Sequence, residues 1–374
     1  MQKAGILGGG QLGRMLLQAA ANYPVETYVM EKSADCPAAH LCNHFVVGDI
    51  NDFQQVYDFG KGLDVITIEI EQVNVAALKQ LALEGVRVIP HPDILETIQS
   101  KIAQKDFYIQ HQIPTADYVV TQKKEELNNH LHRLPAVHKL NKGGYDGRGV
   151  QILKDENDLS LAFDAPAVLE KQIAIQREIS MLVARNEQGE LAIYPPVEMI
   201  VDPYLNQLDY QISPAILPEP VYWKAEAIAI KVVQSFKSAG LFAIELMVDQ
   251  QQDVWVNETA PRVHNSGHHT IEGNYSSQFD MLWRILLQYP LGNPDPIAPT
   301  AMVNLIGAPD HSGPAVYKGL EAVLSLEHCF VHIYGKKETK PGRKMGHITI
   351  LHTDRAELLH VSNKVKHAVQ VIAE

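Results

Sequence analysis

The sequence is poor in cysteine and has no long apolar run. Only three cysteines occur among its 374 residues, Cys36, Cys42 and Cys329, and none belongs to a Cys-x-x-Cys pair. So small and odd a number argues against a disulfide framework and favours a reducing, cytoplasmic compartment. No apolar run approaches the roughly 18 residues that span a membrane. The N-terminus reads as a strand that runs into glycines, which is not the pattern of a signal peptide.

Basic residues are scarce relative to acidic ones. Lysine and arginine total 32, aspartate and glutamate total 44, and the formal net charge is -12 at pH 7. A nucleic-acid partner is disfavoured because phosphate backbones are bound by basic surfaces. A small phosphorylated ligand needs only a local group of cations and stays compatible with this charge. The length favours roughly two to three domains in a globular protein.

Glycines gather first near the N-terminus, in the run Gly8-Gly9-Gly10-Gln11-Leu12-Gly13. An apolar strand precedes this run, a strong helix follows it, and a second strand ends at Glu31. Gly-x-Gly-x-x-Gly between a strand and a helix is typical of dinucleotide binding. The same turn binds other phosphates, or serves only as a tight connection. Further strands at Val46–Asp49 and Val65–Ile70 predict a parallel sheet. Glu69 and Glu71 then lie where ligands bind in such sheets, or are surface acids at a helix N-terminus.

A second glycine-rich run places four glycines within residues 143–149. It lies between the predicted strands Ala136–Lys139 and Val150–Leu153, so it is a hairpin loop. Backbone N–H groups of such a loop can surround anionic oxygens. The spacing is not that of Gly-x4-Gly-Lys-Ser/Thr, which disfavours a P-loop nucleotidase. The alternative is a solvated, charged hairpin tip.

Two acidic residues fall on a predicted hairpin made of Leu241–Val248 and Val254–Glu258. With a loop of residues 250–253, Glu245 lies opposite Glu258 on one face. Directly opposed carboxylates destabilise a sheet unless a cation lies between them, and Mg²⁺ is commonly held by one or two carboxylates plus phosphate oxygens. A register slip of one residue would separate the two side chains and remove this argument.

Two further polar stretches are candidates for anion binding. The run after Glu258 contains Arg262, His264, Asn265 and Ser266, which suit a small-anion pocket; its histidine spacing does not match a zinc site. Near the C-terminus, residues 336–344 carry five cations in nine residues. That cluster is a candidate phosphate clamp or a solvated hairpin tip.

The remaining elements predict an α/β chain in three parts. Helices are expected at Ile94–Gln112, Lys123–Leu134, Ala225–Ala239, Ser277–Tyr289 and Arg355–Ile372. Proline-rich connections at Pro90–Pro92 and Pro290–Pro296 are expected to separate these parts. The last 85 or so residues are expected to form a small mixed domain.

Four blocks of the sequence together resemble a known family. They are residues 8–15, 142–149, 257–268 and 340–347, and they lie in order over nearly the whole chain. They are similar to the signature blocks of the N5-carboxyaminoimidazole ribonucleotide synthetases, within the ATP-grasp superfamily. The resemblance implies an N-terminal parallel-sheet domain (1–100), a central ATP-grasp domain (101–290) and a small C-terminal domain (291–374). It also implies a cytoplasmic homodimer.

The activity implied by this resemblance is an ATP-dependent carboxylation in purine biosynthesis. Bicarbonate would attack the γ-phosphate of ATP to give ADP and carboxyphosphate, and 5-aminoimidazole ribonucleotide would then be carboxylated at its amine. Mg²⁺ is the implied metal, with Mn²⁺ as an alternative, and Glu245 and Glu258 would be its ligands.

The same resemblance implies the roles of individual residues. The ATP-binding set is Lys101, Lys139, Gly144, Tyr145, Asp146, Gly147, Arg148, Gly149, Val150, Glu170, Lys171, Gln172, Ile173, Glu178, Asn257 and Glu258. The catalytic set is Arg262, His264, Asn265, Asp146, Tyr145 and Arg148. The substrate-binding set is Gln11, Leu12, Glu71, Lys336, Arg343 and Lys344.

Two other functions remain open at this point. Another ATP-grasp ligase, such as a formate-dependent glycinamide ribonucleotide transformylase or a biotin carboxylase, would share the fold, ATP and Mg²⁺ but use a different acceptor. A non-catalytic NAD(P)-binding regulator would use only the first glycine motif.

Overall fold

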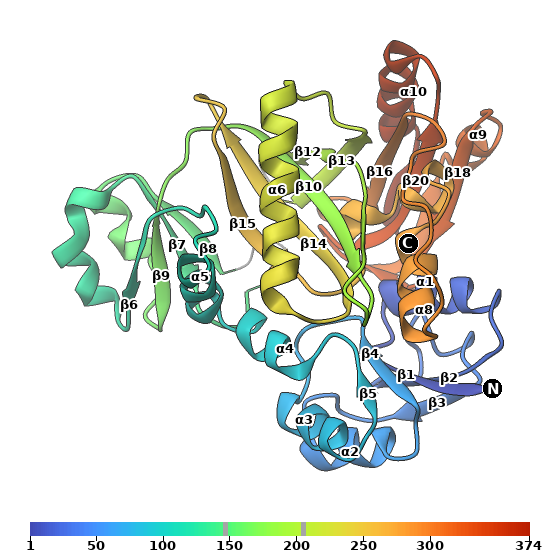
Figure 1. Cartoon of the computed structure of the whole chain (residues 1–374). Helices are drawn as coiled ribbons and strands as arrows, with labels where there is room; N and C mark the ends of the chain where they lie inside the picture. The colour runs from blue at the N-terminus through green and yellow to red at the C-terminus, as the bar shows by residue number, and fades with distance from the viewer. Residues whose placement is uncertain (145–148, 203–206) are drawn as a thin grey trace.

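The N-terminal part is a parallel sheet covered by helices on both faces. A computed structural model describes residues 1–144, 149–202 and 207–374 of the chain (Figure 1). The first sheet has the order β3-β2-β1-β4-β5, and all its strands are parallel. Ile6 packs in the core with α1 and α8, whereas its neighbour Leu7 packs with α2 and α3, because successive strand residues face opposite sides. The elements are β1 (Gln2–Leu7), α1 (Gln11–Ala20), β2 (Val25–Glu31), β3 (His44–Val47), α2 (Phe53–Gly60), β4 (Val65–Ile68), α3 (Val75–Leu83) and β5 (Arg87–Val88).

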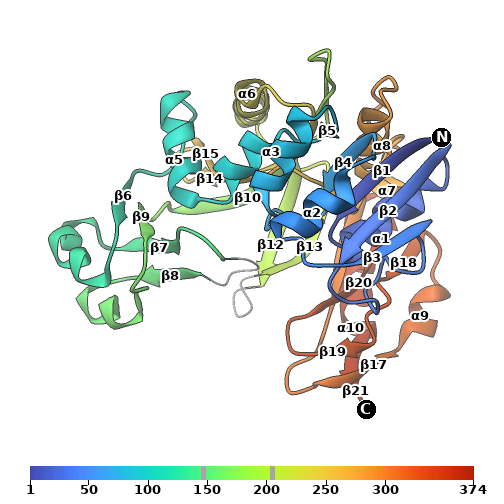
Figure 2. The same ribbon diagram turned by 90° about the horizontal axis from the view of Figure 1, so that it is seen from below.

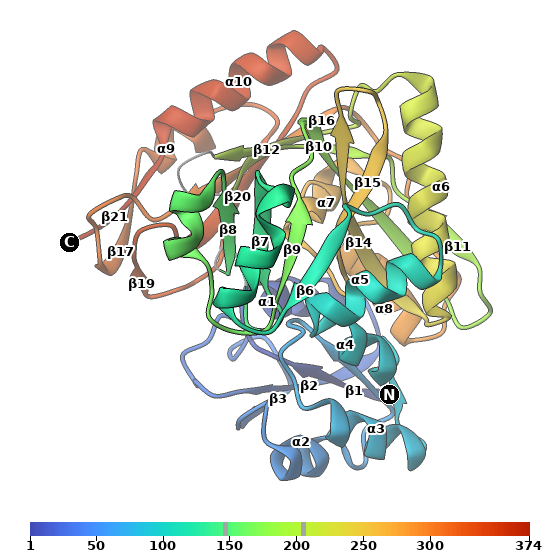
Figure 3. The same cartoon turned by 90° about the vertical axis from the view of Figure 1, so that its left-hand side faces the viewer.

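Two short helices lead from this sheet into a small antiparallel sheet of order β6-β9-β7-β8. Viewed from its own side, the small sheet lies across from β10 and β14 of a larger sheet, with α5 beside it (Figure 3). The elements are α4 (Pro92–Ile98), α5 (Lys101–Gln110), β6 (Tyr118–Thr121), η1 (Lys124–Arg133), β7 (Ala136–Leu140), β8 (Val150–Leu153), η2 (Glu156–Leu161) and β9 (Ala167–Lys171).

The large sheet has the order β15-β14-β10-β12-β13-β16-β20-β18, with β11 paired to β10. The amphipathic helix α6 packs along β10 and β14 and buries Val232, Val233 and Phe236 there. The elements are β10 (Ile175–Arg185), β11 (Leu191–Ile193), β12 (Val197–Asp202), β13 (Gln207–Ser213), α6 (Glu219–Phe236), β14 (Gly240–Asp249), β15 (Val254–Ala260), η3 (Asn265–Gly267), α7 (Thr270–Gly273) and α8 (Gln278–Leu286).

The C-terminal strands extend this same sheet. β16 pairs with β13 on one side and with β20 on the other, so residues beyond 300 continue the hydrogen-bonded surface. A separate three-stranded sheet, β19-β17-β21, lies beneath α10 (Figure 2). The elements are β16 (Thr300–Ile306), β17 (Gly313–Lys318), α9 (Leu320–Leu324), β18 (Cys329–Ile333), β19 (Glu338–Thr339), β20 (Lys344–Leu351), α10 (Arg355–Ala368) and β21 (Gln370–Ala373).

Several predicted helices have the wrong extent. The helix expected at Ile94–Gln112 is two helices, because the Ser100 side chain accepts a hydrogen bond from the Ala103 N–H and starts α5 anew. The helix expected at Arg355–Ile372 ends at Ala368, and the residues after it form β21, paired with β17.

Three other helices differ less. The segment predicted at Lys123–Leu134 is a 3-10 helix, η1, and α6 begins at Glu219 rather than Ala225. The helix predicted at Ser277–Tyr289 is α8, which ends at Leu286. Among the residues that the structure describes, no helix is both long and apolar enough to cross a bilayer.

Candidate active site

The register of β14 and β15 brings Glu245 and Glu258 directly opposite each other. Next to the turn, Val248 pairs with Val254. The predicted loop of residues 250–253 would instead pair Asp249 with Val254, so the observed register differs by one residue. Continued without change, that register would pair Glu245 with Asn257. A β-bulge between Glu245 and Leu246 of β14 shifts the pairing by one residue and restores the predicted partners. The predicted opposition is confirmed, although the predicted loop was wrong by one residue.

The two carboxylates have different surroundings. Glu258 forms an ion pair with Lys101, the first residue of α5, and this cation holds the pKa of Glu258 down at about 2. Burial, together with the charge of Glu258 opposite, raises the pKa of Glu245 to about 8. Too little positive charge therefore surrounds Glu245 to keep its carboxylate ionised, as expected at a candidate cation site.

These carboxylates suit a magnesium ion that is completed by phosphate oxygens. Across the described ranges, no group of three or more His, Cys, Asp or Glu side chains could hold a metal on its own. The pair Glu245 and Glu258 fits Mg²⁺, which is often bound through one or two carboxylates and a substrate phosphate. Glu178 lies on the same face of the sheet, beside the Ser180 that pairs with Glu245, and burial raises its pKa.

A buried glutamate joins two lysines between the small sheet and α5. The Glu170 carboxylate lies 3.0 Å from Lys139 Nζ and 3.2 Å from Lys105 Nζ, and it is 2% exposed. Lys139 Nζ also donates to Asn257 Oδ1 at 2.9 Å, which links β7 to the bulged strand β15. Burial lowers the pKa of Lys105 to about 8. Lys139 is therefore oriented toward the Glu258 side of the site.

Lys105 was given no role from the sequence. Its spacing of four residues from Lys101 places both lysines on one face of α5, and that spacing was the available signal. The predicted adenine-binding segment begins at the same Glu170. Within it, the Lys171 N–H donates to the carbonyl of Asp117 at 2.7 Å, and the Ile173 carbonyl accepts from Ile175.

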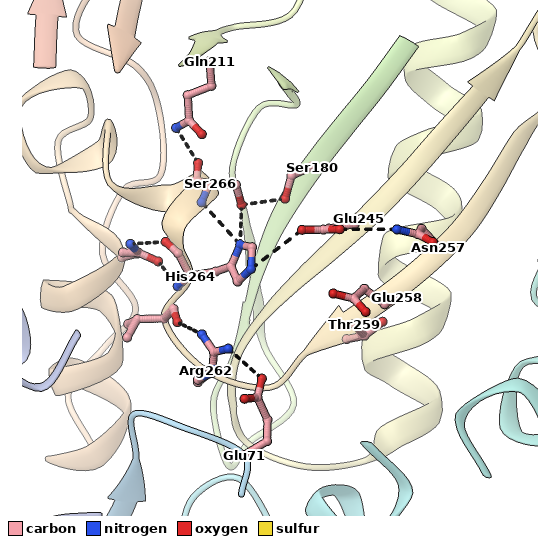
Figure 4. Close-up of polar contacts among 12 residues, drawn as sticks. Glu71, Ser180, Gln211, Glu245, Asn257, Glu258, Thr259, Arg262, His264 and Ser266 are labelled. Atoms are coloured by element: carbon pink, nitrogen blue, oxygen red, sulfur yellow. Dashed lines mark hydrogen bonds and ion pairs between the residues drawn. The ribbon is translucent and has the colours of Figure 1, made fainter. Parts of the chain in front are cut away.

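The stretch after Glu258 forms a compact cluster of polar contacts (Figure 4). Arg262 Nη2 lies 2.9 Å from Glu71 Oε1, so the end of the first sheet meets the hairpin of the large sheet. His264 Nε2 lies 3.7 Å from Glu245 Oε1. Asn265 is 8% exposed, and within the described structure neither atom of its side-chain amide has a hydrogen-bond partner. These groups offer donors to a small anion beside the carboxylate pair.

Some residues of the predicted phosphate clamp contact the first glycine turn and one another. Lys336 Nζ donates to Gln11 Oε1 at 2.6 Å and to the Lys344 carbonyl at 2.6 Å. Gln11 begins α1, so the C-terminal region meets the first glycine turn, while Leu12 packs against the core. No hydrogen bond joins Arg343 to Gln11 or Lys336 among the described residues, and its Nη1 donates to the Glu338 carbonyl at 2.7 Å.

Only the edges of the glycine-rich loop are described. Gly149 has φ +82°, a backbone conformation that favours glycine, and its carbonyl accepts from the Leu140 N–H at 2.9 Å. Gly144 and Val150 flank the loop and are half-buried. The predicted roles of Tyr145, Asp146, Gly147 and Arg148 fall outside the described residues.

The first glycine turn already holds an anion of the protein itself. Glu69 Oε1 accepts from the Gly10 N–H and Oε2 from the Gly13 N–H, both at 2.7 Å. A Cβ at Gly10 would lie 2.6 Å from Glu69 Oε1. These N–H groups would meet the pyrophosphate in a dinucleotide-binding fold, so their use by Glu69 argues against NAD(P) at this turn.

Domain comparisons divide the chain into three matches. Residues 1–99 match the ribonucleotide synthetase preATP-grasp domain, residues 106–279 the ATP-grasp domain, and residues 300–361 the phosphoribosylaminoimidazole carboxylase C-terminal domain.

Whole-chain relatives carry related names. The N5-carboxyaminoimidazole ribonucleotide synthase of Brucella melitensis is 36% identical, over 92% of this chain and 95% of that protein. The chloroplastic phosphoribosylaminoimidazole carboxylase of Vigna aconitifolia is 34% identical over 93% of this chain. The chain spans 63% of that longer protein.

Solved structures are similar over the full length. The N5-carboxyaminoimidazole ribonucleotide synthetase of Thermotoga maritima has a TM-score of 0.93 and 38% identity, covering 100% of both chains. The Aspergillus clavatus enzyme in complex with ADP and 5-aminoimidazole ribonucleotide has a TM-score of 0.88 and 30% identity, covering 98% of both. The predicted ATP-grasp fold is confirmed, and the chain belongs to the N5-carboxyaminoimidazole ribonucleotide synthetase family.

Proposed function

We propose that the chain carboxylates 5-aminoimidazole ribonucleotide with bicarbonate at the expense of ATP, as a step of purine biosynthesis. The observation that carries this proposal is the opposed pair Glu245 and Glu258, next to a donor-rich pocket at Arg262 and Asn265. A phosphate-activating site therefore lies beside a site for a small anion. The names of the relatives supply the identity of the substrates.

ATP would lie between the small sheet and the large sheet. Lys101 and Lys139 reach into this space from α5 and β7, and their charges would balance those of the phosphates. Glu178, on the sheet face next to Glu245, would accept from the ribose hydroxyls. The segment Glu170–Ile173 would contact adenine through its backbone, and loop residues 144–150 would cover the phosphates.

Mg²⁺, or Mn²⁺ in its place, would be held by Glu245 and Glu258. When bound, this ion neutralises charge on the phosphate oxygens and so favours attack at the γ-phosphorus. The protein contributes the carboxylate pair on a sheet, which keeps both side chains at one position without a mobile loop. Asn257, next to Glu258, adds a side-chain amide 3.4 Å from Glu245 Oε2.

Bicarbonate would bind at Arg262, His264 and Asn265. One of its oxygens attacks the γ-phosphorus, ADP leaves, and carboxyphosphate remains in the pocket. The amine of the ribonucleotide then takes the carboxyl carbon, directly or as CO2, and phosphate is released. Because carboxyphosphate reacts with water, the site must exclude solvent. The low exposure of Arg262 and Asn265 is consistent with that need.

The ribonucleotide would bind between the first glycine turn and the C-terminal region. Gln11, Leu12, Lys336 and Lys344 would receive its 5′-phosphate, and Glu71 would help to position it. Arg343 would contribute from the same hairpin, where its Nη1 donates to the Glu338 carbonyl. Tyr145, Asp146 and Arg148 are proposed to contact the aminoimidazole from the loop.

The test is ADP release from ATP and Mg²⁺, with and without bicarbonate and the ribonucleotide. Strong stimulation by the ribonucleotide that is lost in Glu258→Gln would support the proposal. Turnover stimulated only by another acceptor, such as glycinamide ribonucleotide, would retain the ATP-grasp chemistry and discard the substrate. We also propose a cytoplasmic homodimer, which sedimentation of the purified chain would test.

A further inference from the structure

We infer that Ser266 is a positioning residue that holds neutral His264 as the tautomer with its proton on Nε2. In that form His264 can only donate from Nε2, toward the side of Glu245. This inference rests on the proposed function for the identity of the anion that receives the hydrogen bond. The assignment of the proton itself rests on contacts within the protein.

The first contact is between His264 Nδ1 and the backbone of Ser266. The Ser266 N–H points at Nδ1, with 3.3 Å between the two nitrogens. A backbone N–H can only donate, so Nδ1 must offer its lone pair. Neutral imidazole carries one proton, and that proton is therefore on Nε2.

The second contact is a pair of buried hydroxyls. Ser266 Oγ lies 2.9 Å from His264 Nδ1 and 2.8 Å from Ser180 Oγ. Ser266 is 0% exposed and Ser180 is 1% exposed. Because each hydroxyl has one proton, Ser266 donates to Nδ1 when Ser180 donates to Ser266. Ser180 stands on β10 directly opposite Glu245 of β14, so the chain of hydrogen bonds starts on the sheet that carries the carboxylates.

Both residues are held firmly in place (Figure 4). The His264 backbone is bound twice by Gln278, which accepts from its N–H and donates to its carbonyl, each at 2.8 Å. The Ser266 carbonyl accepts from Gln211 Nε2 at 2.7 Å, and Gln211 is fully buried. The distance between the imidazole and Ser266 is thus fixed before any ligand binds.

The consequence concerns the part that His264 takes in the reaction. A general base at Nε2 would need a lone pair there, which requires a proton on Nδ1. That proton would point at the N–H of Ser266. His264 is therefore arranged to stabilise negative charge on bicarbonate or on the carboxyphosphate formed from it, as a hydrogen-bond donor.

Two-bond ¹H–¹⁵N NMR of the ligand-free chain with ¹⁵N-labelled histidine tests this directly, because it distinguishes the two tautomers. Loss of a signal set in His264→Gln identifies the residue. We expect the Nε2–H form in the wild type. In Ser266→Ala the backbone N–H at position 266 remains, so the Nε2–H form should persist, but the Nδ1 ¹⁵N resonance should move downfield because its lone pair loses the hydroxyl donor. Ser266→Thr, which keeps the hydroxyl, should restore the wild-type spectrum. In Ser266→Ala, kcat should fall about 10-fold with little change in KM for ATP.

Controls separate positioning from folding. Ser362→Ala removes another buried serine hydroxyl, in α10, and should leave the His264 signals unchanged. Should Ser266→Ala fail to fold, Ser180→Ala removes the hydroxyl one step further away and should give a smaller shift of the same kind. The Nδ1–H form in the wild type, or serine variants with an unaltered Nδ1 resonance, would overturn the inference. The spectra need no substrate, so a correct tautomer in a chain without carboxylation activity would refute only the proposed function.

Discussion

Two acidic positions on strands, one buried and one partly exposed, differ in which groups compensate their negative charge. At the first, both oxygens of Glu69 accept backbone N–H groups at the start of α1. At the second, Glu245 and Glu258 face each other across a β-bulge, and Glu258 alone has a strong ion pair, with Lys101. Backbone groups of the protein bind both oxygens of the first carboxylate, although burial still raises the pKa of Glu69, so we assign that carboxylate a structural role. At the second position the pair keeps one carboxylate without a close lysine or arginine partner among the described residues, which is where we propose that a cation and its phosphates bind.

Glu245→Gln tests most directly whether the second position binds a cation. The variant keeps the shape and removes the charge, so we expect ADP release to fall by about 100-fold or more. The free energy of unfolding without Mg²⁺ should change little at pH 7, because the amide replaces a carboxyl group that is largely protonated there. Glu321→Gln, on the exposed helix α9, is the matched control and should change neither quantity. Full activity in Glu245→Gln would show that Glu245 is not a metal ligand.

For Glu69→Gln we expect a loss of stability without a loss of nucleotide binding. The amide NH2 of the new side chain would face the N–H of Gly10 or Gly13, so one buried donor would lose its acceptor. Urea denaturation should show a loss of about 1–3 kcal/mol in the free energy of unfolding. Binding of Mg²⁺ and ADP, measured by calorimetry on the folded variant, should be unchanged. Lost nucleotide binding at unchanged stability would contradict the structural role.

Lys105→Met tests the part of the second region that the sequence did not reveal. Glu170 is shared by Lys105 and Lys139, so without Lys105 its charge would hold Lys139 more tightly and away from the nucleotide. We expect KM for ATP to rise about 10-fold, equivalent to about 1.4 kcal/mol. Lys154→Met, an exposed change beyond β8, is the control. An unchanged KM would show that Lys139 is positioned without this partner.

The smallest expected effect is on the pH dependence of metal binding. The pKa of Glu245 is raised from 4.5 to about 8, so the folded protein binds a proton there that the unfolded chain releases. This group therefore lowers stability as the pH rises from 4.5 to 8. Mg²⁺ must displace the same proton, so its affinity in the presence of ADP should rise about five-fold between pH 7 and 8. Calorimetry in two buffers should detect the released proton, and Glu245→Gln should abolish this dependence.

Local patterns in the sequence were enough for the first sheet and for most of the candidate site. Apolar strands around the glycine turn predicted the parallel sheet. Of the two acidic residues expected at its ligand-binding edge, Glu69 accepts backbone N–H groups of the glycine turn, and the role of Glu71 stays a prediction. The pairing of Glu245 with Glu258 was predicted from a simple hairpin. It holds because a one-residue error at the turn is cancelled by the bulge. A bulge depends on neighbouring strands, and so does not follow from the hairpin sequence.

Tertiary contacts explain the rest of what was missed. Residues 370–373 continue a helical pattern, yet they form β21 because β17, more than fifty residues earlier, offers a strand to pair with. The use of the first glycine turn by Glu69 joins residues 59 positions apart. Arg343 sits in a cationic cluster, but the direction of its side chain is set by a carbonyl at Glu338.

The turn between β14 and β15 offers a practical use. Asp249 closes it from within, since its carboxylate accepts from the N–H groups of Gln251 and Asp253 and from the indole of Trp255. The register at the carboxylates is set by the bulge and by pairing with β10 rather than by this turn. Residues 250–252 are exposed, so a fluorophore or small reporter domain inserted there would be carried on the strands of Glu245 and Glu258, where we propose that the nucleotide binds. Such an insertion would turn the chain into an optical sensor for ATP.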